Sequence, residues 1–146
     1  MTYNGSVVRD GSSSLKYILT GEGRYVMNGV TGTAEYHLTD HLGNVRVVLG
    51  STGDVLQRND YYPFGLLMAQ EGSSTNRYLY NGKEEQELTG WLDYGARMYD
   101  AAVGRWFNMD PMAESRLNNS GYAYCQNNPV DRVDPDGALD MRYVDE

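Results

Sequence analysis

The sequence predicts a mainly β fold of successive antiparallel β-hairpins that ends in an irregular C-terminal plug with one or two short helices. The composition has 17 Gly and 13 Tyr against two Phe and two Trp. Tyrosine favours the half-buried faces of β-strands, and glycine favours tight turns. A weak repeat, Gly43-Asn44-Val45 and Gly53-Asp54-Val55, has the spacing of one strand plus one turn. A chain of 146 residues is one domain or part of one, with a core of modest size.

Short alternating segments separated by turn residues predict the individual strands. Asn28-Gly29 favours a two-residue hairpin turn, because both residues tolerate positive φ. Residues 1–33 are predicted to be a poorly defined N-terminal segment with short strands. The strands predicted in the first half are Lys16–Thr20, Arg24–Met27, Ala34–Leu38, Val45–Leu49 and Val55–Tyr62.

The second half of the chain is predicted to be less regular. Glu71–Asn76 is typical of a solvated loop. Trp91–Tyr99 alternates in the manner of one continuous strand. A helix of one or two turns is possible at residues 84–88, and another short helix is predicted between Ser120 and Gln126.

Charge, cysteine content and hydropathy exclude several classes of function. The formal net charge of −8 argues against nucleic-acid binding, since the chain has no cluster of basic residues for phosphates. Cys125 is the single cysteine, so the chain forms no internal disulfide, and we expect a small buried side chain there. The N-terminus lacks the pattern of a signal peptide, and no apolar run has the length of a membrane span. If the chain reaches the cell surface, a larger parent or partner is expected to carry it.

No metal or cofactor site is predicted. His37 and His41 have helical i, i+4 spacing, but Asp40 and Leu42-Gly43 between and after them indicate a turn. Four carboxylates near the C-terminus lack the spacing of a calcium loop and favour a solvated acidic tail: Asp131, Asp134, Asp136 and Asp140.

Two Asp-Pro pairs carry the chemistry that the sequence offers. Asp110-Pro111 and Asp134-Pro135 each hold an aspartate at a rigid, non-helical corner. One interpretation is structural, because Asp, Pro and Gly in this order suit a type I turn. The other is an aspartic dyad, in which one ionised carboxylate activates water while a protonated partner polarises a carbonyl. The residues themselves leave both interpretations open.

Several motifs in a fixed order resemble a known family. Going along the chain, these are Tyr36–Arg46, Asp60–Gly65, Gly104-Arg105-Trp106, Asp110-Pro111, Tyr122-Ala123-Tyr124, Asn127-Asn128-Pro129 and Asp134-Pro135-Asp136-Gly137. Together they resemble the Rhs repeat-associated core domain, the C-terminal core of the Rhs and YD-repeat proteins of bacterial polymorphic toxins. The resemblance assigns residues 34–137 to the core and residues 138–146 to a short tail.

The resemblance implies a function for the whole chain. In the family this segment seals one end of a hollow β-spiral shell that encloses a toxic polypeptide, and this chain resembles an orphan or truncated form without a payload. One alternative is an aspartic autoprotease that cuts its own chain, and another is a β-edge module that pairs with another YD-repeat chain. The implied partners are other shell segments or a second copy, and the family context implies export or the cell surface as part of a larger assembly.

The resemblance also implies site residues. Asp110 and Asp134 would form the dyad, and Arg105 would supply a charge that holds the site together. Cleavage would fall in the region of Gly137, Ala138 and Leu139. The family pattern has Leu directly after Gly, whereas Leu139 comes one residue later here. We therefore expect slow or absent cutting, at Ala138-Leu139 or Leu139-Asp140.

Overall fold

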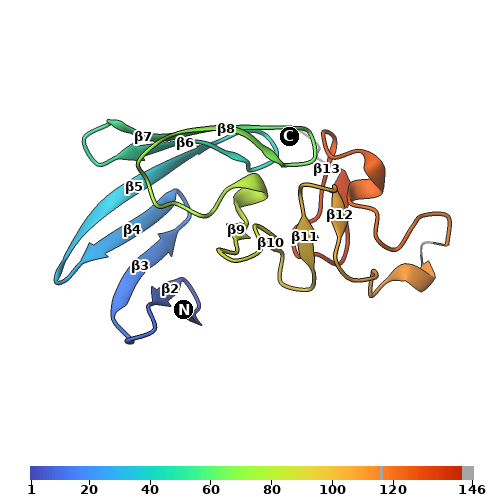
Figure 1. Cartoon of the computed structure of the whole chain (residues 1–146), viewed down its shortest axis with the longest axis horizontal. Coiled ribbons are helices and arrows are strands. Elements are labelled where there is room, and N and C mark those ends of the chain that lie inside the picture. Colours follow the sequence, from blue (N-terminus) through green and yellow to red (C-terminus); the bar gives the residue numbers. More distant parts are fainter. Residues whose placement is uncertain (116, 143–146) are drawn as a thin grey trace.

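An eight-stranded antiparallel sheet forms the N-terminal half of the computed structural model, which describes residues 1–115 and 117–142. Each strand pairs with its neighbour in sequence, so the spatial order is β1 to β8 (Figure 1). The mainly β architecture of successive hairpins is therefore confirmed. The strands are β1 (Thr2–Asn4), β2 (Val7–Arg9), β3 (Leu15–Thr20), β4 (Gly23–Asn28), β5 (Thr31–Thr39), β6 (Val45–Gly50), β7 (Val55–Tyr61) and β8 (Leu67–Gly72).

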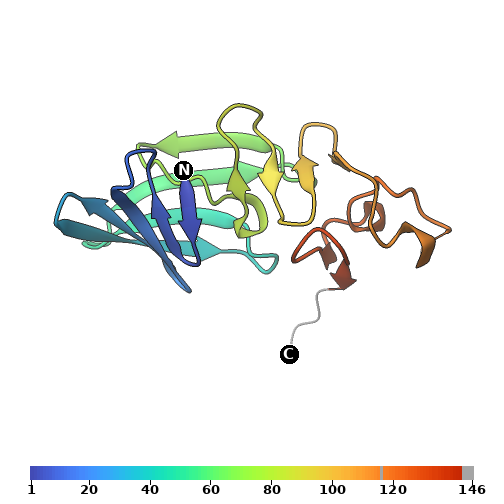
Figure 2. The same ribbon diagram turned by 90° about the horizontal axis from the view of Figure 1, so that it is seen from below.

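The C-terminal half consists of short elements that extend from one end of this sheet (Figure 2). Four strands form a second sheet in the order β12-β11-β10-β9, and β13 pairs with β14. No described helix has the length and apolar character needed to cross a bilayer. The elements are η1 (Tyr80–Gly82), β9 (Glu84–Glu85), β10 (Leu92–Asp93), β11 (Met98–Asp100), β12 (Arg105–Trp106), η2 (Ala113–Ser115), η3 (Cys125–Asn127), β13 (Arg132–Val133) and β14 (Met141–Arg142).

Most predicted strands of the first half are present with small shifts at their ends. The Asn28-Gly29 turn is confirmed, because Asn28 pairs with Thr31 and Gly29 has a φ of 67°. Residues 1–33 contain β1 to β4 and the start of β5. The sequence analysis missed β8, whose residues are almost all exposed, so that no buried alternation marks it.

The prediction of one strand over Trp91–Tyr99 was wrong. The segment is a hairpin in which Leu92 pairs with Tyr99, and Gly95 in the turn has a φ of 95°. The Asp93 carboxylate accepts a hydrogen bond from the Gly95 N–H and stabilises the turn. A glycine inside an alternating pattern is a known signal for such an interruption.

The helices expected at residues 84–88 and 120–126 are not formed as predicted. Glu84–Glu85 is strand β9, and residues 120–124 are irregular, with Ala123 in an isolated β-bridge to Arg105. The described residues contain three single-turn 3₁₀ elements instead. In η3 all three residues have positive φ, at 46°, 53° and 59°, so the turn has left-handed backbone conformation.

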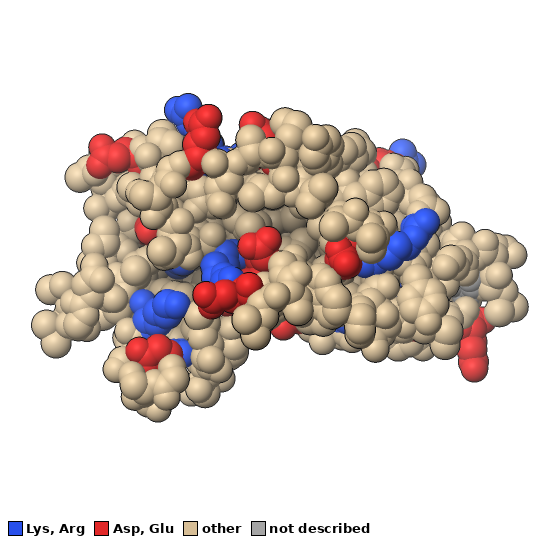
Figure 3. Space-filling model, in the orientation of Figure 1, with Lys and Arg blue, Asp and Glu red and all other residues tan. Residues whose placement is uncertain are grey.

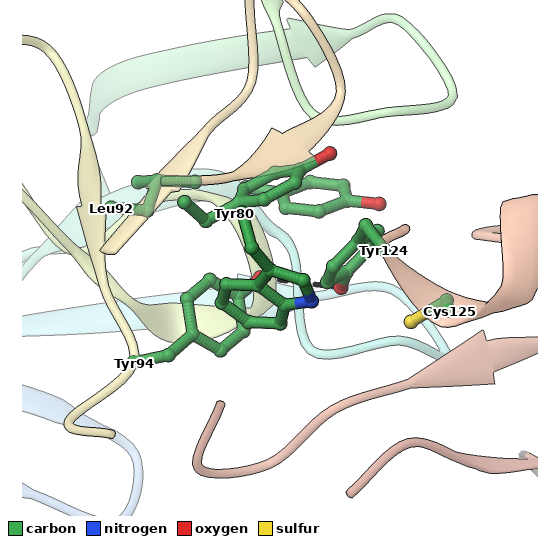
Figure 4. Close-up of a cluster of buried hydrophobic side chains, with 7 residues drawn as sticks. Tyr80, Leu92, Tyr94, Tyr124 and Cys125 are labelled. Carbon is green, nitrogen blue, oxygen red and sulfur yellow. Dashed lines mark hydrogen bonds between the residues drawn. The ribbon is translucent and has the colours of Figure 1, made fainter. Parts of the chain in front are cut away.

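An aromatic cluster forms the core of the C-terminal half. Tyr94, Tyr99 and Tyr124 are at most 3% exposed and surround Trp106, which is also buried. Figure 4 shows Tyr80, Leu92, Tyr94 and Tyr124 converging from separate segments. Cys125 lies beside them, so its predicted burial is confirmed, and this burial raises its pKa to about 12.

The hydroxyl groups of the buried tyrosines all have acceptors. Tyr94 and Tyr124 each donate to Asn81 Oδ1 at 2.6 Å. Tyr80 donates to the Pro63 carbonyl and Tyr99 to the Phe64 carbonyl. Because an unsatisfied buried hydroxyl is costly, these bonds fix how the cluster sits against the end of the large sheet.

Candidate functional site: a buried arginine between two Asp-Pro corners

Arg97 is the centre of the site, and the β10–β11 hairpin places it there. Its side chain is only 2% exposed, and its guanidinium carbon lies 4.2 Å from the centre of the Trp106 ring. Nη1 donates to the carbonyl of Gly121 and Nε to the carbonyl of Gly137. One side chain thus joins the hairpin to two distant loops.

The structure brings Asp110 and Asp134 together on this arginine. The Oδ2 atoms of both aspartates lie 3.4 Å from the same nitrogen, Nη2 of Arg97. Asp110 is 8% exposed and Asp134 is 1% exposed. Because both Oδ2 atoms lie 3.4 Å from Nη2, the distance between them is at most twice that value.

Each aspartate also stabilises its own corner, as the structural interpretation of the Asp-Pro pairs expects. Asp110 Oδ1 accepts from the Met112 N–H at 2.7 Å. Asp134 Oδ1 accepts from three N–H groups, those of Asp136, Gly137 and Ala138. In both residues Oδ1 serves the turn and Oδ2 faces Arg97, so the turn interpretation and a shared site coexist.

Opposing effects act on the charge of Asp134. Burial raises the pKa of Asp134 above its ordinary value of 3.8, while the Gly137 and Asp136 N–H groups and the Arg97 charge act to lower it. Burial is the largest of these effects. The carboxyl group is therefore easier to protonate than an aspartate in water, despite the arginine beside it.

Gly137 fits tightly against the hairpin. Its φ is 81°, and a Cβ at this position would lie 2.9 Å from the Arg97 backbone nitrogen. Any other residue would be strained here and would push the second corner away from the arginine. The predicted cleavage region reaches the surface at Leu139, which is 50% exposed. The next residue, Asp140, is buried and pairs with Arg132.

Arg105 lies elsewhere. It is exposed on β12, and its Nη1 donates a hydrogen bond to Asn127 Oδ1. The guanidinium that contacts the two carboxylates belongs to Arg97, which the sequence analysis did not select. The available signal was Gly95, which ends β10 early and turns Arg97 back towards the core.

The site offers acid–base groups and one small enclosed space. A cavity of about 10 Å³ beside Asp110, lined also by Ser120 and Gln126, has room for one water molecule. The described residues include no group of three or more His, Cys, Asp or Glu side chains arranged to hold a metal ion. The arrangement can hold the C-terminal segment rigidly, and it can place a carboxylate next to a water molecule.

The fold and site define a class of protein. The chain is a meander of hairpins, and its last segment turns back and is fixed by a buried arginine. This arrangement is that of a segment of a β-shell. A family model described as Teneurin YD-shell matches residues 14–130, and the chain belongs to this family. The YD-repeat part of the resemblance is confirmed, and the assignment to the Rhs core stays a prediction.

Curated relatives are much longer than this chain. Salivary gland surface protein 1 of Aedes aegypti is 39% identical over 110 residues, which are 73% of this chain and 3% of that protein. The tRNA nuclease WapA of Bacillus subtilis is 37% identical over 108 residues, 70% of this chain and 5% of the relative. Toxin subunit YenC1 of Yersinia entomophaga is 32% identical over 107 residues, 70% of this chain and 11% of the relative.

Solved structures agree on the fold. The crystal structure of TcdB2-TccC3-Cdc42 matches 90% of this chain and 7% of that chain, with a TM-score of 0.73 and 25% identity. A structure of the Photorhabdus luminescens Tc holotoxin pore matches 99% of this chain and 8% of that chain, with a TM-score of 0.77 and 23% identity. The chain thus corresponds to a small part of each of these solved chains.

Proposed function

We propose that this chain is the end-closing module of a YD-repeat shell. In this proposal β1 to β8 continue the wall of the shell, and the segment from η1 to β14 is the plug that closes it. The observation that carries the proposal is the buried Arg97, which ties the β10–β11 hairpin to the corners at Asp110 and Asp134. The strands of the plug have only two or three residues each, so its sheets alone hold its shape weakly, and a buried ion pair adds rigidity.

The aromatic cluster supports the same proposal. Tyr61 and Phe64 lie at the end of the large sheet and pack against the cluster formed by the C-terminal half. Tyr80 and Tyr99 donate hydrogen bonds to the backbone between β7 and β8. The plug is therefore attached to the sheet by apolar packing and by hydrogen bonds.

A chimera tests this function. The matching segment of YenC1 is replaced by this chain, and a protease-sensitive reporter protein is fused behind it. We expect the reporter to resist added protease, whereas the same chimera with Arg97→Ala exposes it. Equal digestion of the reporter in both chimeras would contradict the sealing role.

A second candidate is self-cleavage. It is favoured by two carboxylates on one guanidinium, a cavity for one water beside Asp110, and a hydrogen bond from Arg97 to the Gly137 carbonyl next to the predicted cleavage region. The chemistry requires one carboxyl group to donate a proton while the other accepts one. The raised pKa of Asp134 suits it for the donating role.

Intact mass spectrometry of the fresh and the incubated protein tests this candidate. We expect full-length chain to predominate and any slow loss to follow Ala138 or Leu139, since Leu139 is displaced from the family position. Asp110→Asn and Asp134→Asn should each abolish that loss, and Arg105→Ala should leave it unchanged because Arg105 does not contact the carboxylates. Cleavage that persists in both Asn variants would show that Asp110 and Asp134 are not the catalytic dyad.

A further inference from the structure

A large groove lies away from the Arg97 site, between the N-terminal strand β1 and the sheet of β9 to β11. Its volume is about 680 Å³, within the range of ligand-binding clefts. Tyr3, Trp91 and Met98 contribute apolar surface to its lining. We call it the acidic groove, because Glu84, Glu85, Glu87 and Asp93 also line it.

The charge balance of the acidic groove is one-sided. Against four carboxylates the lining side chains include a single cation, Arg77, which pairs with Glu87 at 3.0 Å. Figure 3 shows acidic side chains on the part of the surface over β9 and β10, with basic side chains beside some of them. The lining side chains of the groove therefore carry a formal excess of three negative charges.

Tyrosine hydroxyls hold Glu84, and Glu85 is half-buried beside it on β9. Glu84 accepts hydrogen bonds from the hydroxyls of Tyr3 at 2.8 Å and of Tyr17 and Tyr78 at 3.4 Å. Burial raises the pKa of Glu85, and the Arg77 charge offsets this only in part. A cation entering the groove would lower the electrostatic cost of keeping both carboxylates ionised.

The apolar surface of the groove is solvent-accessible and aromatic. The Trp91 ring lies 4.3 Å from that of Phe107, which is 58% exposed, and Leu88 is 98% exposed. Tryptophan, tyrosine and methionine are the side chains that protein interfaces favour, and tryptophan is the ring that attracts cations most strongly. Apolar and acidic surface therefore alternate within one cleft.

We propose that the acidic groove binds an extended basic segment of another polypeptide, with lysine or arginine side chains at the carboxylates and an apolar side chain against Trp91. Charge complementarity favours this occupant over a second copy of the chain, whose formal net charge is −8. Most arginines of the chain already pair with carboxylates of their own chain, namely Arg24, Arg46, Arg77, Arg97, Arg132 and Arg142.

Fluorescence anisotropy tests the proposal with a labelled peptide that repeats Lys-Gly-Leu. We expect binding that weakens as salt is added, and no binding of the matched peptide that repeats Glu-Gly-Leu. The double variant Glu85→Gln/Glu87→Gln should bind the basic peptide about tenfold more weakly. Glu71→Gln/Glu114→Gln changes net charge equally, and neither residue lines the groove, so this control should bind as the parent does.

Two results would overturn the proposal. If binding of the basic peptide weakens equally in the two double variants, the peptide is attracted by the overall charge of the protein and not by the groove. Sedimentation showing a dimer that the Glu85→Gln/Glu87→Gln variant alone loses would assign the groove to a second copy. Circular dichroism of each variant confirms that the fold is unchanged before the peptide is added.

Discussion

The Arg97 guanidinium joins groups from loops far apart in sequence, and its energetic weight follows from its burial. A charge that is 2% exposed has lost nearly all contact with water, and Asp110 and Asp134 have lost most of theirs. Such a pair adds little net stability when intact, but removing one partner leaves an uncompensated buried charge. Arg97 is therefore a residue whose loss is costly whatever the site does chemically.

We predict that Arg97→Ala lowers the free energy of unfolding by about 3–5 kcal/mol. Urea denaturation followed by tryptophan fluorescence measures this, since Trp106 lies against the guanidinium. The control is Arg46→Ala, which removes an ion pair whose side chains are 44% and 51% exposed and which should cost less than about 1 kcal/mol. Equal effects of the two substitutions would contradict the role assigned to Arg97.

The pKa of Asp134 should lie above its ordinary value of 3.8, because burial is the dominant effect on it. A raised pKa means that the folded state binds the proton more tightly than the unfolded chain. The stabilising contribution of this proton is therefore complete below pH 3.8 and is lost as pH rises through the folded pKa.

Asp10 is the matched control in the same titration. Hydrogen bonds from Ser12 and Ser14 lower its pKa below 3.8, so its contribution is present above that pH and is lost as pH falls through the folded pKa. Carboxyl ¹³C NMR follows both groups in one sample. We expect Asp134 to titrate at higher pH than Asp10, and the reverse order would refute the burial argument.

The site could be predicted only in part at the scale of residues. Asp110 and Asp134 stand out in the sequence because proline fixes their corners, and the structure places both on one cation. Arg97 could not be chosen, because its inward direction depends on the turn at Gly95 and on packing against Trp106. The catalytic role of Asp110 and Asp134 stays a prediction.

At the scale of elements, η1 is the joint between the two halves. Asn81 has a φ of 49°, and its Oδ1 accepts from Tyr94 and Tyr124. Its Nδ2 donates to the Leu42 carbonyl, and its N–H donates to Asn44 Oδ1 in the β5–β6 turn. One asparagine thus connects the large sheet to the aromatic cluster.

Two substitutions separate the contributions of Asn81. Asn81→Gly keeps the positive φ and removes the acceptor, so at least one tyrosine hydroxyl is left unsatisfied, at about 1–3 kcal/mol. Asn81→Ala should cost about 1–2 kcal/mol more, because alanine is strained in the left-handed region. Thermal and urea unfolding of both variants measure the difference, and an alanine variant as stable as the glycine variant would contradict it.

The elements of the first half were predictable because local turn chemistry and alternation agree there. Asn28-Gly29 specifies a turn, and β7 alternates between buried and exposed residues from Gln57 to Asp60. The second half has strands of two or three residues, too short to show a period, and its shape depends on contacts between segments distant in sequence. The division at residues 33 and 137 stays a prediction.

At the scale of the whole molecule, an open meander leaves two edges. β1 pairs only with β2 and β8 only with β7 within the described chain. Unpaired N–H and C=O groups on such edges can pair with another chain, which in a shell would be the next part of the wall. The third candidate function, pairing with another YD-repeat chain, depends on these edges.

We predict that the isolated chain self-associates through these edges and does not remain a monomer over a wide concentration range. Met68 lies on the edge strand β8 and is 56% exposed, so Met68→Lys places a charge on the edge without disturbing the core. Light scattering after size exclusion should show a dimer or larger species for the parent and a shift towards monomer for Met68→Lys. The control is Val30→Lys, an equal gain of charge at a residue that is 99% exposed and lies in the turn between β4 and β5, which should leave the mass unchanged. A parent that stays monomeric at every concentration would show that its edges are not available for pairing, and a mass lowered equally by both variants would assign association to net charge.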